Sequence, residues 1–172
     1  QETFSCINTK NSLAEGSYLS IEAGISILMG AEEVIGHNII KYDIPVLEKL
    51  YPDFKIKGKV FDTLSTSKLI YPDIADLDYR MIAKRKYDIP KKLIGKYSLK
   101  AFGYRLGELK GDFNEQEDCW TEWSVSMQRY CEQDVVVTTK LYNNLKSKDA
   151  SQEALDLEHK FAQIIFKQEQ RG

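Results

Sequence analysis

Tyr130 and Asp134 are the residues whose types and spacing come closest to a chemical site. They stand four apart in a stretch with helical periodicity, so a phenol and a carboxylate lie on one helix face and can point into the same site. Tyrosine and aspartate at this spacing also occur in many helices that carry no site. Packing within the fold is therefore the alternative interpretation of this pair.

Asp43 is a candidate carboxylate from a different part of the chain. It follows an apolar run at residues 33–38, which predicts a buried strand ending at a sheet edge, and a polar and aromatic segment at residues 37–42. Functional groups are often found where the strands of an α/β sheet end. Asp43 also stands two residues before Pro45 in the pattern of a helix N-cap, and capping is an alternative role compatible with the first.

Alternating strands and helices must position these groups. Strand patterns occur at residues 2–7, 33–38 and 60–63, and Asp62 in the last of these is interpreted as a helix cap rather than a ligand. Helical patterns cover residues 20–30, 43–50, 99–107, 124–146 and 153–170, and Ser98 and Gly107 begin and end the third helix. The residues expected to pack in the interior are Phe102, Tyr104, Trp120 and Trp123. This order of elements predicts one α/β domain.

One segment of the chain is strongly basic. Between Tyr79 and Lys100 the only acidic residue is Asp88, and the cations are Arg80, Lys84, Arg85, Lys86, Lys91, Lys92, Lys96 and Lys100; an acidic loop follows at residues 112–118. A solvated loop and a contact to a nucleic-acid backbone are both compatible with this pattern.

Composition narrows the class of protein. The chain has 172 residues, 42% of them hydrophobic, and a formal net charge of −2, so it can build a core but lacks a generally basic surface. A nuclease remains possible, because metal ions held by carboxylates can neutralise phosphate. Three widely spaced cysteines indicate a reduced, intracellular protein. We find neither a membrane span nor a targeting leader in the sequence.

Four segments, in this order, resemble the exonuclease domain of family A replicative DNA polymerases of T-seven-like bacteriophages. They are GHNIIKYDIP at 36–45, FDTL at 61–64, LKAFGYRLGE at 99–108 and YCEQDVVVT at 130–138. The third is the most specific, because its aromatic-Gly-Tyr-Arg-Leu-Gly string has no general structural reason to recur. The resemblance covers nearly the whole chain.

The resemblance implies a fold and a domain organisation. We expect a ribonuclease-H-like α/β fold with a mixed sheet flanked by helices, which lacks its first strands because the strand at residues 2–7 aligns with the third strand of the family. Residues 1–150 would form a 3′-to-5′ exonuclease domain, and residues 151–172 the start of the polymerase domain. The implied function is proofreading during phage DNA replication in the bacterial cytoplasm.

The resemblance also implies a reaction and a set of site residues. Members of this superfamily use four acidic residues to hold two Mg²⁺ or Mn²⁺ ions at the scissile phosphate, since these hard ions prefer oxygen ligands. By position, Asp43 and Asp134 match two of the four carboxylates, and Tyr130 matches a phenol that orients the attacking water. The residues expected to bind the substrate, a single-stranded 3′ end of DNA, are His37, Asn38, Tyr42, Lys91 and Lys92; strand-end packing is the alternative for the first three.

The chain departs from the family in one respect. The Asp-x-Glu motif that supplies the other two carboxylates should precede Asp43 on a strand, and we do not find it. The Ser20-Ile21-Glu22 segment has Ser in place of Asp, and in Asp156-Leu157-Glu158 the two acids lie in a helical pattern, where residues two apart point in nearly opposite directions. We therefore predict that the isolated chain has little nuclease activity and weak metal affinity.

Two other functions stay open at this stage. One is an exoribonuclease of the same superfamily, and the other is a non-catalytic nucleic-acid-binding module. If the chain is part of a polymerase, its partner is the rest of that chain, and any processivity factor would bind the polymerase part.

Overall fold

The computed structural model describes residues 5–6, 18–108 and 121–171. The acidic loop at 112–118 and Trp120 lie outside the described residues, as do most residues of the strand predicted at 2–7. Within the described parts the chain is mixed α/β and mostly helical. In chain order the elements are β1 Ser5–Cys6, β2 Tyr18–Leu19, α1 Ile21–Gly30, β3 Glu33–Gly36, α2 Asp43–Leu50, β4 Lys59–Asp62, α3 Thr63–Ile70, α4 Ile74–Ala83, the 3₁₀ helix η1 Lys91–Leu93, α5 Leu99–Leu106, α6 Val125–Lys146 and α7 Gln152–Glu169.

The described strands form two parallel pairs. β3 pairs with β4 from Glu33 opposite Lys59 to Gly36 opposite Asp62, and the very short β1 pairs with β2. A parallel register brings the carboxyl ends of β3 and β4 to the same edge, so the segments after Gly36 and Asp62 lie side by side. A mixed sheet was expected from the resemblance, and the described pairs contain no antiparallel partner.

Polar caps begin most of the helices, as the sequence predicted at two positions. The Ser98 side chain accepts a hydrogen bond from Ala101 N at the start of α5, and Gly107 ends that helix with a left-handed φ of 70°. Asp62 caps α3, as expected. Asp43 does not cap α2: it is the first helical residue, and Tyr42 occupies the cap position without a side-chain capping hydrogen bond. The capping prediction for Asp43 is therefore wrong.

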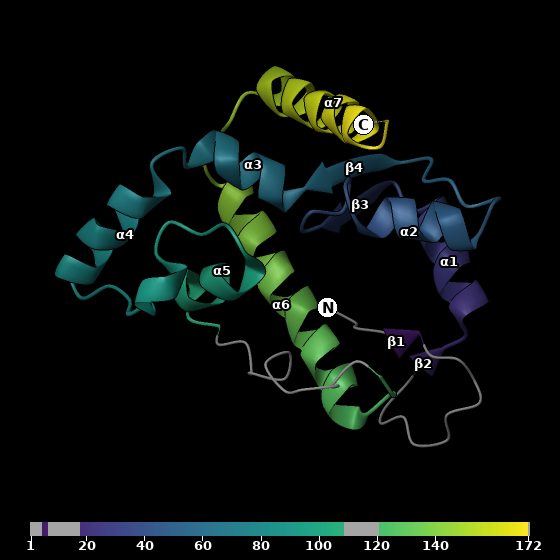
Figure 1. Ribbon diagram of the computed structural model, residues 1–172, viewed down its shortest axis with the longest axis horizontal. Helices are drawn as coiled ribbons and strands as arrows, with labels where there is room; N and C mark the ends of the chain where they lie inside the picture. Colours follow the sequence, from purple (N-terminus) through teal and green to yellow (C-terminus); the bar gives the residue numbers. More distant parts are fainter. Residues whose placement is uncertain (1–4, 7–17, 109–120, 172) are drawn as a thin grey trace.

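Helix α6 forms the centre of the main core. Its side chains Val137, Leu141 and Leu145 are almost fully buried against a cluster from four other elements, namely Phe61, Ile74, Phe102 and Leu155. In Figure 1 α6 crosses the middle of the molecule, with α4 and α5 on one side and the β3–β4 pair, α1 and α2 on the other. The predicted burial of Phe102 is confirmed, whereas Tyr104 and Trp123 are half-buried.

Helix α7 covers α3 and β4 on the outer side of the strand pair (Figure 1). The ring of His159 packs edge-on against Phe61, and its Nε2 lies 3.2 Å from Asp62 N and 3.1 Å from Thr66 Oγ1. At the other end of the helix, Glu169 forms an exposed ion pair with Lys41 at 2.9 Å. None of the helices within the described ranges is long and apolar enough to cross a membrane.

Candidate functional site

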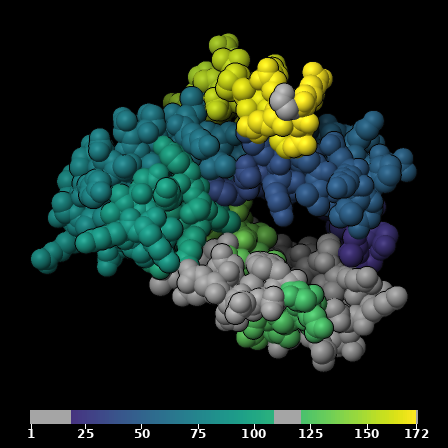
Figure 2. Space-filling model, in the orientation of Figure 1, coloured from purple at the N-terminus to yellow at the C-terminus, as the bar shows by residue number. Residues whose placement is uncertain are grey.

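A cavity of about 720 Å³ lies between the β3–α2 region and helix α6. Its walls come from β3, the start of α2, Leu99 at the start of α5, and the face of α6 that carries Asp134, Val135 and Thr138. The space-filling view shows the surface hollowed between the blue atoms of α2 and the green atoms of α6 (Figure 2). A cavity of this size can hold a nucleotide-sized ligand.

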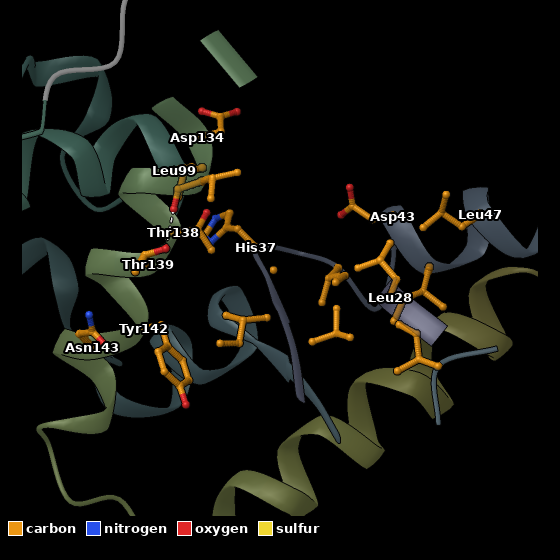
Figure 3. Close-up of a pocket in the computed structure, with 17 residues that line it drawn as sticks. Leu28, His37, Asp43, Leu47, Leu99, Asp134, Thr138, Thr139, Tyr142 and Asn143 are labelled. Atoms are coloured by element: carbon orange, nitrogen blue, oxygen red, sulfur yellow. Dashed lines mark hydrogen bonds between the residues drawn. The ribbon is translucent and has the colours of Figure 1, made fainter. Parts of the chain in front are cut away.

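Asp43 and Asp134 both line this cavity. Figure 3 shows Asp134 on α6 and Asp43 at the start of α2, on opposite sides of the view with His37 between them. Asp43 is exposed and Asp134 is half-buried. The two carboxylates, which come from distant parts of the sequence, therefore face one solvent-accessible space.

Asp62 fixes the segment that leads from β3 to Asp43. This buried carboxylate is 1% exposed. It accepts four backbone hydrogen bonds: its Oδ1 from Asn38 N at 3.2 Å, Leu64 N at 2.8 Å and Ser65 N at 3.2 Å, and its Oδ2 from Ile40 N at 3.1 Å. Asn38 adopts a left-handed φ of 65°, a conformation that asparagine tolerates better than most residues. One acid thus caps α3 and also holds the turn before α2.

The position of Asp43 disfavours its ionised form. Partial desolvation at the cavity wall raises the pKa of Asp43, the nearby Asp62 carboxylate raises it further, and a backbone hydrogen bond acts in the opposite direction. A divalent cation beside Asp43 would reverse this effect, because opposite charge favours the carboxylate.

His37 forms part of the cavity wall between the two acids. Its Nε2 donates to the Tyr97 carbonyl at 2.9 Å, since a carbonyl can only accept, and its Nδ1 lies 3.0 Å from Thr63 Oγ1. The imidazole also meets the Phe102 ring edge-on, with centroids 6.1 Å apart. These contacts fix the ring, so His37 is a rigid wall of the cavity rather than a mobile side chain.

The other predicted site residues lie outside the cavity wall. Tyr130 is 8% exposed and packs in the interior, although it is one turn from Asp134 on α6. Tyr42 is 65% exposed beside Asp43, and Asn38 contributes a backbone N–H to the Asp62 network. Lys91 and Lys92 are exposed on η1.

The fit to a metal site is partial. Two carboxylates facing one cavity are suitable oxygen ligands for Mg²⁺ or Mn²⁺. However, the described residues contain no group of three or more His, Cys, Asp or Glu side chains that could hold an ion. Glu22 lies on α1 and Asp156 on α7, and neither lines the cavity. The described side chains thus supply at most part of a two-ion site.

Two features near the site were not predicted from the sequence. Asp62 was expected only to cap a helix, whereas its carboxylate also holds Asn38 and Ile40. Asp78 had no predicted role, and it forms a buried ion pair with Arg105. An Asp directly after a strand signalled the cap, but the contacts over long sequence separations have no local signal.

No protein-family model matches the chain. It is, however, similar to part of the DNA-directed DNA polymerases of bacteriophages, which confirms the resemblance indicated by the motifs. Two such relatives are the DNA-directed DNA polymerases of Escherichia phage T7 and Enterobacteria phage T3; each is 32% identical over an alignment that covers 81% of this chain and 25% of the relative. The chain thus spans about a quarter of the length of these curated relatives.

Proposed function

We propose that this chain is the proofreading 3′-to-5′ exonuclease domain of a phage replicative DNA polymerase, with a ribonuclease-H-like fold. The observation that carries the proposal is the shared cavity of Asp43 and Asp134. Carboxylates that converge from distant segments on a solvent-accessible space are the arrangement that metal-assisted phosphodiester hydrolysis requires. The similarity to two phage polymerases supports the assignment to this class.

Asp43 and Asp134 would hold two of the ligand positions of a two-ion site for Mg²⁺ or Mn²⁺. The ions would supply activation of water and stabilisation of the leaving 3′ oxygen. The remaining ligands would come from an Asp-x-Glu pair that the given sequence lacks on any strand. This is why we predict little hydrolysis and weak metal binding by the chain alone.

The substrate in this proposal is a single-stranded 3′ end of DNA. His37 would form a fixed wall beside the terminal nucleotide, and the exposed ring of Tyr42 would offer a stacking surface next to Asp43. Asn38 would shape the turn between them. A mispaired terminus is preferred because its unpairing costs less free energy. Lys91 and Lys92 would contact the phosphate backbone upstream.

The Tyr130 hydroxyl would orient the attacking water in this proposal. Tyr130 is 8% exposed and stands one helical turn from Asp134 on α6, and it is not among the residues that line the cavity. A Tyr130→Phe variant tests this role directly: loss of rate without loss of substrate binding would support it.

The decisive experiment uses the polymerase chain that contains this segment together with its upstream residues. Release of 3′-terminal nucleotides from single-stranded DNA is measured with and without Mg²⁺. Asp43→Asn and Asp134→Asn should each lower the rate by about 10²-fold or more, the scale on which groups that stabilise a transition state act. Glu158→Gln on α7 is the control, since it removes a carboxylate away from the cavity wall. Activity that is unchanged in both cavity variants would refute the proposal.

A second candidate is a non-catalytic nucleic-acid-binding module. It is favoured by the absence of a group of three potential metal ligands among the described residues. The same experiment separates the two functions, because a binding module would hold DNA without metal-dependent hydrolysis even with the upstream sequence present. An exoribonuclease would instead prefer an RNA 3′ end.

The proposed domain organisation follows from the same resemblance. Residues 1–150 would form the exonuclease domain and residues 151–172 the start of the polymerase domain, with the rest of that chain as partner. The site of action would be the cytoplasm of the bacterial host, where a processivity factor would act on the polymerase part.

A further inference from the structure

The basic segment between α4 and α5 is built around a buried ion pair. Asp78 is 0% exposed, and it accepts two hydrogen bonds from one edge of the Arg105 guanidinium: Oδ1 from Nε at 2.8 Å and Oδ2 from Nη2 at 2.7 Å. The Arg105 group also lies over the Phe102 ring, 4.9 Å from its centroid. This planar two-bond geometry is available to arginine and not to lysine.

The same ion pair holds both ends of the loop. Near its start, Tyr87 OH donates to Asp78 Oδ1 at 2.7 Å. Near its end, Gly95 N donates to Oδ2 at 2.9 Å, and Arg105 Nη1 donates to the Lys96 carbonyl at 2.8 Å. Ile89, at 3% exposure, anchors the middle of the segment. The loop is therefore fixed at its two ends and its middle by buried groups.

The electrostatics show that these contacts favour ionised Asp78. Burial alone would raise its pKa, but the hydrogen bonds from Arg105, Gly95 and Tyr87 and the charge of Arg105 outweigh it and lower the pKa of Asp78. Burial and the adjacent carboxylate raise the pKa of Tyr87 to about 12, so its hydroxyl remains a donor. The ion pair and its hydrogen bonds are thus mutually dependent.

What the loop presents to solvent is cationic. The exposed charged residues along it are six cations and one anion, Asp88; the cations are Lys84, Arg85, Lys86, Lys91, Lys92 and Lys96. Tyr79, next to the buried Asp78 on α4, is 62% exposed on the helix that precedes the loop. Cationic side chains and exposed aromatic rings are the features with which proteins hold single-stranded nucleic acid.

The loop leads directly to the cavity. Immediately after Lys96, the Tyr97 carbonyl accepts the hydrogen bond from His37, and Leu99 lines the cavity wall. The buried Asp78–Arg105 pair is therefore linked through Lys96 and Tyr97 to His37, in the wall of the cavity that Asp43 and Asp134 share.

We propose that Asp78 and Arg105 are positioning residues: they hold the segment at residues 84–96 as a preformed surface for the phosphate backbone of single-stranded DNA whose 3′ end enters the cavity. This inference takes its ligand from the proposed function. It adds that the lysines bind as a rigid set, so that the loop does not have to be ordered when DNA binds.

The test measures binding of a fluorescent oligothymidylate to the whole chain at several salt concentrations, with EDTA present so that hydrolysis has no part. If Lys91 and Lys92 each contact one phosphate, Lys91→Gln together with Lys92→Gln should reduce the slope of log affinity against log salt by about 1.4. The control pair Lys160→Gln and Lys167→Gln removes two exposed charges on α7 and should leave the slope unchanged.

Arg105→Lys is the decisive variant, because it keeps the charge and removes the two-bond geometry. We expect weaker binding, and a smaller effect of the Lys91 and Lys92 changes in this background than in the wild type, since a loosened loop no longer presents them together. A folded Arg105→Lys protein with wild-type affinity and slope would overturn the inference.

A second variant serves if Arg105→Lys fails to fold. Tyr87→Phe removes one donor from Asp78 and leaves the ion pair in place. It should weaken binding in the same direction but less, and additive effects with the Lys91 and Lys92 changes would count against positioning. If DNA binding depends on Arg105 but the polymerase does not hydrolyse DNA, the proposed exonuclease function is refuted and the inference about the loop stands. If the polymerase hydrolyses DNA equally well with Arg105→Lys, the inference about the loop is refuted and the proposed function stands.

Discussion

Replacement of Asp62 is the sharpest test of how the site is held. Its carboxylate accepts hydrogen bonds from Asn38, Ile40, Leu64 and Ser65 while only 1% exposed. In Asp62→Asn, the amide nitrogen replaces one oxygen, so either Ile40 N or the three donors on the other oxygen lose their acceptor. One buried unsatisfied donor costs about 1–3 kcal/mol, and we expect about 2 kcal/mol for this variant.

Asp62→Ala removes the whole set of acceptors. Loss of the α3 cap contributes about 1 kcal/mol, and the abandoned donors of Asn38 and Ile40 add about 2 kcal/mol each, for a sum of roughly 5 kcal/mol. Urea unfolding followed by circular dichroism gives the free energy of unfolding of each variant. A loss of this size is a large part of the stability of an ordinary domain.

Asp73 offers a matched control for this experiment. It is also an aspartate at a helix N-cap, on α4, but its side chain makes no capping hydrogen bond and is exposed. Asp73→Ala should cost less than about 0.5 kcal/mol. Equal losses from Asp62→Ala and Asp73→Ala would refute the reasoning, because they would show that the four hydrogen bonds of Asp62 add nothing to a bare cap position.

Three further predictions concern the core, a close backbone contact and pH. Leu141→Ala, at a 0% exposed site, should destabilise the chain by about 3 kcal/mol in urea unfolding, whereas Leu157→Ala, at a 69% exposed site, should cost less than about 0.5 kcal/mol. Gly58→Ala should destabilise strongly because its Cβ would lie 2.2 Å from the Ala31 carbonyl oxygen, while Gly30→Ala, with open space around it, should be neutral or slightly stabilising in thermal melts. The folded state lowers the pKa of Asp78. The contribution of Asp78 to stability is therefore complete above its pKa in the unfolded chain, near 3.8, and is lost as the pH falls through its lower pKa in the folded chain. Asp78→Asn should remove that part of the pH dependence of the unfolding free energy, measured by urea titration at several pH values.

Each of these has a result that would count against it. Equal costs at Leu141 and Leu157 would contradict the burial pattern of α6 and α7. A harmless Gly58→Ala would mean that the turn before β4 can move away from Ala31. An unchanged acid profile in Asp78→Asn would show that another carboxylate dominates acid unfolding.

Much of the local structure follows from local residue chemistry. Ser98 and Gly107 bound α5, and Asp62 begins α3, because caps satisfy backbone groups only a few residues away. Asp43 shows the limit of this reasoning, since its pattern predicted a cap and the helix begins one position earlier. The turn at residues 38–40 is held by the Asp62 side chain as well as by backbone hydrogen bonds from Lys41, Tyr42 and Ile44, so the local pattern alone did not determine the boundary.

The sequence by itself determined most of the strands and helices, although not β2 or α4, and it determined the similarity to phage polymerases and the choice of Asp43 and Asp134 as candidate acids. Periodicity, caps and motifs are properties of neighbouring residues. Only the tertiary structure decided that these two acids share one cavity, that Tyr130 packs in the interior, and that Asp78 and Arg105 hold the basic loop beside that cavity. Those facts depend on contacts between residues far apart along the chain, which form only when α6, α5 and the β3–β4 pair pack together.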